Sequence, residues 1–225
     1  MVTEDGTGRA NQKRRTRVAI VGACRDIIRS GAPVTMPDVA KVALVSEATA
    51  YRYYPDLVSL LNEALVGLWP SPAEALGPVA GSSDPAERVA FACEFLLRGV
   101  LAYQGAVRAV ISATITHSEL AVVRPGIRFG LIDEALAPFS NTLAITDPPA
   151  LAQLKRDLAG VISAEAFFSL TDLAGLTPGE AIASLVRTAT TVTQAALTQD
   201  PRPAAAGPAD PPGVSRGRSL GWERC

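Results

Sequence analysis

The spacing of apolar residues along positions 34–61 predicts three short helices in close succession. Thr35, followed three residues later by Asp38, has the spacing of a capping box at the start of the first helix. Ser46 and Asp56 are residue types that cap the other two helices well. A tight turn before Ser46 joins the first helix to the second, which makes this segment a helix-turn-helix.

In the helix predicted over 47–53, small residues come first and large polar residues come last. Small side chains let the start of a helix approach a DNA groove, whereas Arg and Tyr reach base edges and phosphates. Thr35 and Ser46 can cap helices and bind phosphate at once, because a helix N-terminus is itself an anion site. The residues that we expect to contact DNA are Arg14, Arg15, Thr35, Met36, Pro37, Ser46, Glu47, Ala48, Thr49, Tyr51, Arg52 and Tyr53.

These residues have distinct expected roles, and each role has a structural alternative. The hydroxyls of Tyr51 and Tyr53 would meet phosphate oxygens, although Tyr51 could instead pack in the core. Arg52 prefers guanine, Glu47 could accept a hydrogen bond from cytosine, and Ala48 could contact a thymine methyl. Any of these three could instead be a solvated surface residue.

The same segment resembles a known family. It matches the pattern T-x-x-x-[IV]-A-x-x-A-x-V-S-x-x-T-x-Y-x-[YF]-[FY] at Thr35, Val39, Ala40, Ala43, Val45, Ser46, Thr49, Tyr51, Tyr53 and Tyr54. Over about residues 14 to 65 the chain therefore resembles the tetracycline-repressor (TetR) family of one-component transcription regulators. Leu44 stands where the family usually has Gly, so we expect this turn to avoid the left-handed conformation that Gly tolerates best. Leu57 stands where the family often has Lys, so one phosphate contact should be missing.

Helical periodicity continues on both sides of this segment, and no strand pattern is present. The first helix should open at Lys13 and end at Gly31 and Pro33. Thr177 and Glu180 form a second capping-box pattern, at the start of the last helix. The later helices are expected over 84–103, 106–116, 126–139, 147–175 and 177–197. The predicted fold class is all-α.

Composition divides the chain into four parts. Residues 1–12 are polar and are expected to form a disordered arm, and residues 13–69 should form the three-helix DNA-binding domain. A stretch rich in Pro, Gly and Ser over 70–84 marks the boundary to a helical body over 70–199. Residues 200–225 are expected to form a disordered tail whose function the sequence does not indicate.

The net charge of −1 does not indicate nucleic-acid binding, but the distribution of charge does. Residues 9–29 hold seven Arg or Lys and one Asp, whereas residues 71–199 hold eight basic and twelve acidic residues. A basic N-terminal region on an acidic body suits DNA contact, because neutralising phosphates needs local positive charge. The alternative is a charged helix start that is simply solvated.

The two C-terminal helices are apolar on more than one face, which is too much for one packing partner. A homodimer is the simplest source of a second partner, and the resemblance implies a four-helix bundle between two subunits. The residues that we expect in this interface are Leu158, Ile162, Phe167, Leu185 and Val192.

The resemblance also implies that the body binds a small molecule in a cavity between its middle helices. Candidates for the lining are the large or polar-tipped residues Trp69, Phe91, Phe95, Arg98, Tyr103, His117, Phe129 and Phe168. Each of them could instead be an ordinary core residue, and His117, the single histidine, could be a surface residue. Arg98, Arg108 and Glu94 would need partners if they were buried.

Other classes of function have little support in the sequence. Cys24 and Cys93 lie in apolar helical patterns, which predicts buried, reduced thiols. There is no metal-ligand spacing, no paired nucleophile and base, and no Gly-rich phosphate loop, so neither an enzyme nor a cofactor is expected. No apolar run of about 18 residues and no signal core are present, which predicts a cytoplasmic protein that does not enter a membrane.

The motif and the resemblance together predict a homodimeric regulator that binds double-stranded DNA at a palindromic operator. The mode that we expect is repression, with release from the operator by a small-molecule effector. One alternative is a DNA-binding dimer that needs no ligand. Another is a helical small-molecule-binding protein with weakened DNA affinity, which Leu44, Leu57 and the acidic Glu47 would favour.

Overall fold

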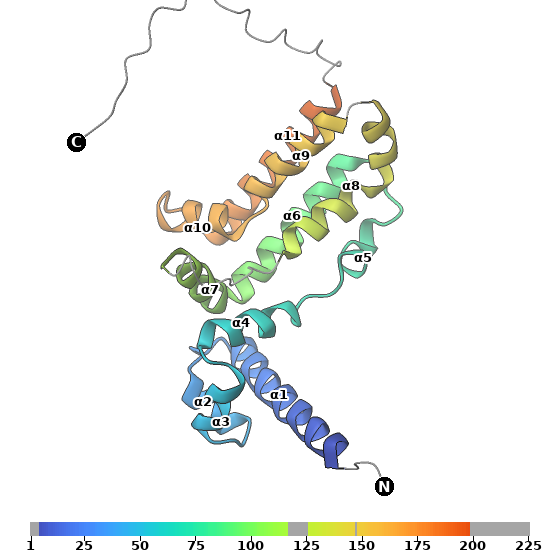
Figure 1. Cartoon of the computed structure of the whole chain (residues 1–225). Coiled ribbons are helices and arrows are strands. Elements are labelled where there is room, and N and C mark those ends of the chain that lie inside the picture. Colours follow the sequence, from blue (N-terminus) through green and yellow to red (C-terminus); the bar gives the residue numbers. More distant parts are fainter. Residues whose placement is uncertain (1–4, 117–125, 147, 199–225) are drawn as a thin grey trace, which may run out of the picture.

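The computed structural model describes residues 5–116, 126–146 and 148–198. Helices are the only regular elements in these residues, so the all-α prediction is confirmed. A small N-terminal head and a larger C-terminal body follow one another along the molecule (Figure 1). The predicted tail over 200–225 and the ligand candidate His117 lie outside the described residues.

The head consists of α1 (Asp5–Ser30), α2 (Met36–Val42), α3 (Glu47–Tyr53) and α4 (Leu57–Val66). Its core is formed by side chains that include Ile20, Cys24, Val39 and Leu60, all fully buried. The first helix begins at Asp5 and not at Lys13, so residues 5–12 are helical rather than a disordered arm. This stretch contains no Pro, and adding turns to a nucleated helix is cheap.

Three predicted caps set the boundaries of the short helices. The hydroxyl of Thr35 accepts from the N–H of Asp38 at 3.2 Å, and that of Ser46 accepts from the N–H of Thr49 at 3.2 Å. The Asp56 carboxylate accepts from the N–H of Ser59 at 2.7 Å, which starts α4. The arrangement at Thr35 is not a reciprocal capping box, because the Asp38 carboxylate accepts from the Thr35 hydroxyl at 2.6 Å instead of from the backbone.

The turn between α2 and α3 contradicts one expectation. Leu44 has a φ of +55°, so it adopts the left-handed conformation that we expected this turn to avoid. The reason is a Schellman motif, in which the N–H of Val45 donates to the carbonyl of Ala40 at 3.0 Å and that of Leu44 donates to Lys41. The partly buried Val45 packs on the head core, and the Leu44 side chain is 91% exposed. Hydrogen bonds and packing thus outweigh the strain of a left-handed leucine.

The body is built around α6, which packs against α8 on one side and α11 on the other, with α9 between those two (Figure 1). Its core contains Leu97, Leu136, Leu158 and Phe167, each almost fully buried. The elements of the body are α5 (Pro72–Ala75), the 3₁₀ helix η1 (Gly77–Val79), α6 (Pro85–Ala102), α7 (Gln104–Thr116), α8 (Ile127–Thr146), α9 (Pro148–Val161), α10 (Ala164–Asp172) and α11 (Pro178–Thr198).

The predicted boundary segment contains regular structure, and one predicted helix is broken. The Pro- and Gly-rich stretch over 70–84 is folded, because Ser71 and Glu74 form a capping box for α5 and Leu76 is buried in the body core. The helix predicted over 147–175 is broken between α9 and α10. There the hydroxyl of Ser163 accepts from the N–H of Ala166 and donates to the carbonyl of Gly160, bonds that compete with a continuous helix.

A buried arginine compensates for a proline inside α8. Pro138 has no N–H to offer the carbonyl of Glu134 one turn earlier. The guanidinium of Arg88, which is 2% exposed, donates to that carbonyl at 2.8 Å and to the neighbouring carbonyl of Ala135 at 2.9 Å. It also donates to the carbonyls of Val79 at 2.7 Å and Ala80 at 3.2 Å, and so joins α6, α8 and η1.

The residues predicted for the dimer interface lie mostly in the core of a single chain. Leu158, Ile162 and Phe167 are at most 1% exposed and Leu185 is 7% exposed, because all four pack within the core of their own chain. Val192 is half-buried against the same core. The apolar faces of these helices are covered by other helices of the same chain, since α11 packs on α6, α9 and α10.

Two further expectations concern the cysteines and the membrane. Cys24 and Cys93 are buried free thiols, as predicted, and burial raises the pKa of each to about 12. Among the helices that the structure describes, none combines the length and the apolar character needed to span a bilayer.

Candidate nucleic-acid interface and ligand cavity

The outward surface of α3 is the main candidate for contact with DNA. Ala50 is fully buried and fixes this helix on the head core, whereas Glu47, Ala48 and Arg52 are exposed. Tyr51 is 47% exposed, so it does not pack in the core. Figure 1 shows α2 and α3 at the end of the molecule away from α9 and α11. This arrangement leaves the polar side of α3 accessible to a large partner.

The other predicted residues around the helix-turn-helix divide into surface and core positions. Thr35, Pro37 and Ser46 are exposed and Thr49 is half-buried. Met36 is 3% exposed, so its side chain belongs to the core and only its backbone could meet a phosphate. Tyr53 is half-buried against the head core, with the Arg52 guanidinium 5.9 Å from its ring centre, and Tyr54 is buried.

The basic residues of α1 do not all remain available to a partner. Arg14 and Arg15 are exposed, and Arg15 donates to the side chain of the adjacent Gln12 at 3.2 Å. Arg17 binds both carboxylate oxygens of Glu63 on α4, and these hydrogen bonds lower the pKa of the Glu63 carboxyl. Arg17 therefore ties α1 to α4, and Arg14 and Arg15 are the better candidates for phosphate contact.

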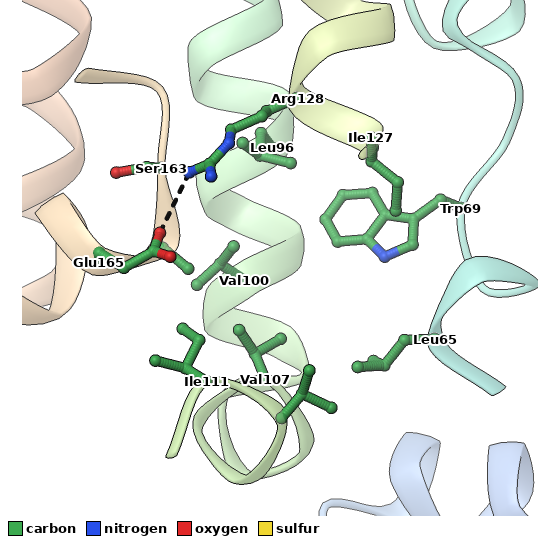
Figure 2. A pocket seen from close by; sticks show the side chains of 12 residues that line it. Leu65, Trp69, Leu96, Val100, Val107, Ile111, Ile127, Arg128, Ser163 and Glu165 are labelled. Atoms are coloured by element: carbon green, nitrogen blue, oxygen red, sulfur yellow. Dashed lines mark hydrogen bonds and ion pairs between the residues drawn. The ribbon is translucent and has the colours of Figure 1, made fainter. Parts of the chain in front are cut away.

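A cavity of about 90 Å³ lies where α4, α6, α7, α8 and α10 meet (Figure 2). Most of its lining is aliphatic, together with the indole of Trp69. The polar groups are Ser163 and the ion pair of Arg128 on α8 with Glu165 on α10, in which Nη1 lies 3.2 Å from Oε2. A second, larger cleft of about 420 Å³ lies between the head and the corner of α6 and α7.

Helix α7 joins the cavity to the head. Ala106 and Val110 of α7 are buried in the head core, and Val107 packs against the cores of both head and body. Val107 and Val110 also line the cavity, as does Leu65 from the head helix α4. A change in the shape of the cavity can therefore reach the head through direct packing.

The structure places few of the predicted ligand residues in this cavity. Among those that the structure describes, Trp69 is the one that lines it; Tyr103 lines the larger cleft and lies with its ring centre 6.2 Å from that of Trp69. The others pack or point elsewhere. Phe91 and Phe95 pack on the body core, Phe168 is buried beneath Arg108, Phe129 is 52% exposed, and Arg98 pairs with Glu94 on the surface at 2.6 Å.

Arg128 and Glu165 were missed because they come together from positions 37 residues apart in the chain. Each lies in a segment whose sequence predicts an ordinary helix, and no local spacing links them. The missed signal was therefore one of tertiary structure.

Comparisons with known proteins bear on the fold. No family model matches the chain, and no curated protein matches it. A solved structure of a TetR transcriptional regulator from Rhodococcus sp. RHA1 is similar, with a TM-score of 0.51 and 20% identity. The similarity covers 80% of this chain and 97% of that one. Together with the helix-turn-helix and the helical body, this similarity shows that the chain has the fold of a TetR transcriptional regulator.

Proposed function

We propose that this protein is a transcription regulator that binds double-stranded DNA through α3. The observation that carries the proposal is the orientation of α3, which buries Ala50 and turns Glu47, Ala48, Tyr51 and Arg52 outward. The structurally similar Rhodococcus protein is itself described as a transcriptional regulator.

In this proposal α3 enters the major groove with its N-terminal end first. Arg52 and Glu47 would contact base edges, and Tyr51 would bind a phosphate oxygen. The exposed hydroxyls of Thr35 and Ser46 would add phosphate contacts at the starts of α2 and α3, and Arg14 and Arg15 would do so from α1. The phosphate contacts would position the head on the DNA, whereas the base contacts would select the sequence.

We further propose that the protein acts as a homodimer on a palindromic operator. Two recognition helices reach successive major grooves when they stand about 34 Å apart, which one copy of the chain cannot achieve. Because the apolar residues of α9 and α11 are used inside the chain, the interface would use the outward residues of these helices. Those residues include Ala152, Arg156, Ala183, Arg187 and Thr191, all exposed.

The proposed regulation is repression with release by a small molecule in the cavity. A ligand shifts an equilibrium only by its difference in affinity for the two states. Because α7 lines the cavity and also packs in the head core, a ligand that moves α7 would favour a different head position. The spacing of the two recognition helices would then no longer match the operator.

The test is selection of bound duplexes from a randomised DNA library, followed by fluorescence anisotropy at several salt concentrations. Replacing Arg52 by Ala should weaken binding about 5- to 100-fold and relax the preference at one base pair, as for loss of a bidentate base contact. Replacing Tyr51 by Phe should weaken binding to all sequences equally, because a phosphate contact carries no sequence information.

The control is Arg98→Ala, which removes an exposed arginine of α6 and should not change DNA binding. Failure of the wild-type protein to enrich any duplex sequence would contradict the proposal. Enrichment that is indifferent to Arg52→Ala and Tyr51→Phe would instead contradict the role of α3.

A specific observation favours a second candidate, a DNA-binding dimer that needs no ligand. The cavity of about 90 Å³ is well below the roughly 300–1,000 Å³ of typical ligand pockets. Operator binding that no small molecule alters would support this candidate over the ligand-released repressor.

A further inference from the structure

The larger cleft, of about 420 Å³, lies where the head meets the corner between α6 and α7. The head lines it with residues of α1, α4 and the loop 31–34, and the body lines it with residues 101–106 and Ala109. Figure 1 shows α7 beside α4 at this junction. The volume falls within the roughly 300–1,000 Å³ of typical ligand pockets, whereas the cavity of about 90 Å³ is smaller than these. The cleft therefore has room for a drug-sized molecule.

The lining of the cleft is almost entirely apolar. Among the described residues that form it, none carries a charged side chain, and the two polar side chains are those of Tyr103 and Gln104. The rest are aliphatic residues, prolines and glycines, such as Ile28, Pro33 and Leu101. Apolar walls with a few polar groups are the usual composition of a small-molecule site.

The charged residues next to the lining in the chain already have partners. Arg29 donates to Asp26 at 3.1 Å, and Arg108 donates to Asp172 at 2.6 Å. The carboxylate of Asp56 caps α4. A charged ligand would therefore lose its water in the cleft without gaining an opposite charge, which is costly. The cleft favours an uncharged ligand.

Tyr103 supplies a hydrogen-bonding group for such a ligand. Its ring is half-buried against the head core and stands edge-on to Trp69. Its hydroxyl makes no hydrogen bond with the other described residues, so it can donate to a ligand or accept from one. We propose that the cleft binds an uncharged, mainly apolar molecule of drug size, which forms a hydrogen bond with the Tyr103 hydroxyl.

A ligand in this position would contact the head and the body at once, and its effect on DNA binding rests on the proposed function. Val34 and Leu57 line the cleft from the head, and Leu101 and Tyr103 line it from the body. The ligand would bind best to the arrangement of head and body in which the cleft fits it, and would favour that arrangement by its difference in affinity. The position of α3 in the DNA groove would change with it.

Anilinonaphthalene is the probe, and anilinonaphthalene sulfonate is the matched anion with the same rings. Both dyes fluoresce more strongly in apolar surroundings than in water. Because an engineered cavity of about 150 Å³ is filled by benzene, the cavity of about 90 Å³ is too small for either dye. In fluorescence titrations the neutral dye should bind about tenfold or more tightly than the sulfonate, since the cleft offers no cation to pair with it. Equal or tighter binding of the sulfonate would overturn the inference.

A variant that fills the cleft tests the location of the site. Gly105 lines the cleft, and a Cβ added to it would meet no atom within 4 Å, so a leucine takes up space without a clash. Gly105→Leu should weaken binding of the neutral dye about fivefold or more. Gly179→Leu is the matched control, because Gly179 is likewise the second residue of a helix, has open space around its Cβ and lies outside the cleft. It should leave dye binding unchanged.

A second variant tests the hydrogen bond and keeps the experiment decisive if Gly105→Leu does not fold. Tyr103→Phe keeps the ring beside Trp69 and removes the hydroxyl. It should weaken binding of the neutral dye about two- to tenfold, the effect of losing one hydrogen bond. Unchanged binding in both variants would mean that the dye binds elsewhere and would overturn the inference. A dye response that appears only after dilution to the monomer would assign the cleft to a second copy of the chain and would also overturn it.

These titrations contain no DNA, so they are independent of the regulator proposal. A protein that binds the neutral dye but enriches no duplex contradicts only that proposal, whereas one that binds DNA but not the dye contradicts only this inference. Saturation with the neutral dye should change the duplex affinity of the wild-type protein about fivefold or more and leave that of Gly105→Leu unchanged. An unchanged wild-type affinity would contradict the effect of the ligand on DNA binding.

Discussion

Two residues of this protein have a backbone conformation or a buried environment that is unusual for their type, and hydrogen bonds around them explain why. Leu44 is left-handed because two Schellman hydrogen bonds close the turn around it. Arg88 is buried because four backbone carbonyls accept hydrogen bonds from its guanidinium. In both cases hydrogen bonds with backbone groups determine the local conformation.

Leu44→Gly should stabilise the protein relative to Leu44→Ala by about 1 kcal/mol. Both variants remove the exposed leucine side chain, but only Gly relieves the cost of a left-handed backbone with a Cβ. Urea denaturation of the two variants measures the difference. Equal stability would show that the turn adopts another conformation in solution.

At the scale of elements, Arg88 and Pro138 should behave as a coupled pair. Arg88→Met should cost about 3–5 kcal/mol, because it removes four hydrogen bonds from a buried charged donor and leaves the carbonyl of Glu134 without one. Pro138→Ala restores the N–H that Glu134 lacks. Its stabilising effect should be larger by about 1 kcal/mol in the Arg88→Met background than in the wild type.

A double-mutant cycle by chemical denaturation gives this coupling energy. Arg98→Met, on the same helix but paired at the surface with Glu94, is the control and should cost less than about 1 kcal/mol. Additivity of Arg88→Met and Pro138→Ala to within about 0.3–0.5 kcal/mol would mean that the guanidinium does not compensate for the proline.

The sequence predicted elements best where a side chain marks the boundary. Ser46 starts α3 and Asp56 caps α4, as local hydrogen bonding requires. The break before α10 was missed, because the apolar pattern continues from Ile162 to Phe167 and a serine between them does not by itself end a helix. Leu44 was misjudged for a related reason, since propensity does not include the bonds that close the turn.

The candidate site could be predicted from sequence only in part. The exposed residues of α3 follow from one helical period around Ala50, so they were available from spacing alone. The cavity was not, because its ion pair joins α8 to α10 and its lining comes from five helices. Large aromatic residues such as Phe91 and Phe95 were poor guides, since they fill the core instead of lining the space.

At the level of the whole molecule, α7 links the packing of the head to the packing of the body. Val110 is 3% exposed and is shared between the head core and the cavity wall. Val110→Ala should lower the free energy of unfolding by about 2 kcal/mol, the cost of two buried methyl groups and the space that they leave. Thermal unfolding followed by circular dichroism should remain a single transition at a lower temperature.

Ile115→Ala is the matched control, because Ile115 lies on the same helix and is 69% exposed. Its effect should stay within about 0.5 kcal/mol. Separate transitions for head and body, in the wild type or in Val110→Ala, would contradict the shared core.

The burial of Ala50 has a consequence for how this protein could acquire new targets. Within α3, which the structure describes throughout, Ala50 is the buried residue and anchors the helix. Substitutions at Glu47, Ala48 or Arg52 leave that anchor untouched and so cost little folding free energy. In the proposed mode of DNA binding, specificity would therefore diverge among descendants of this chain one base pair at a time, while the scaffold stays the same.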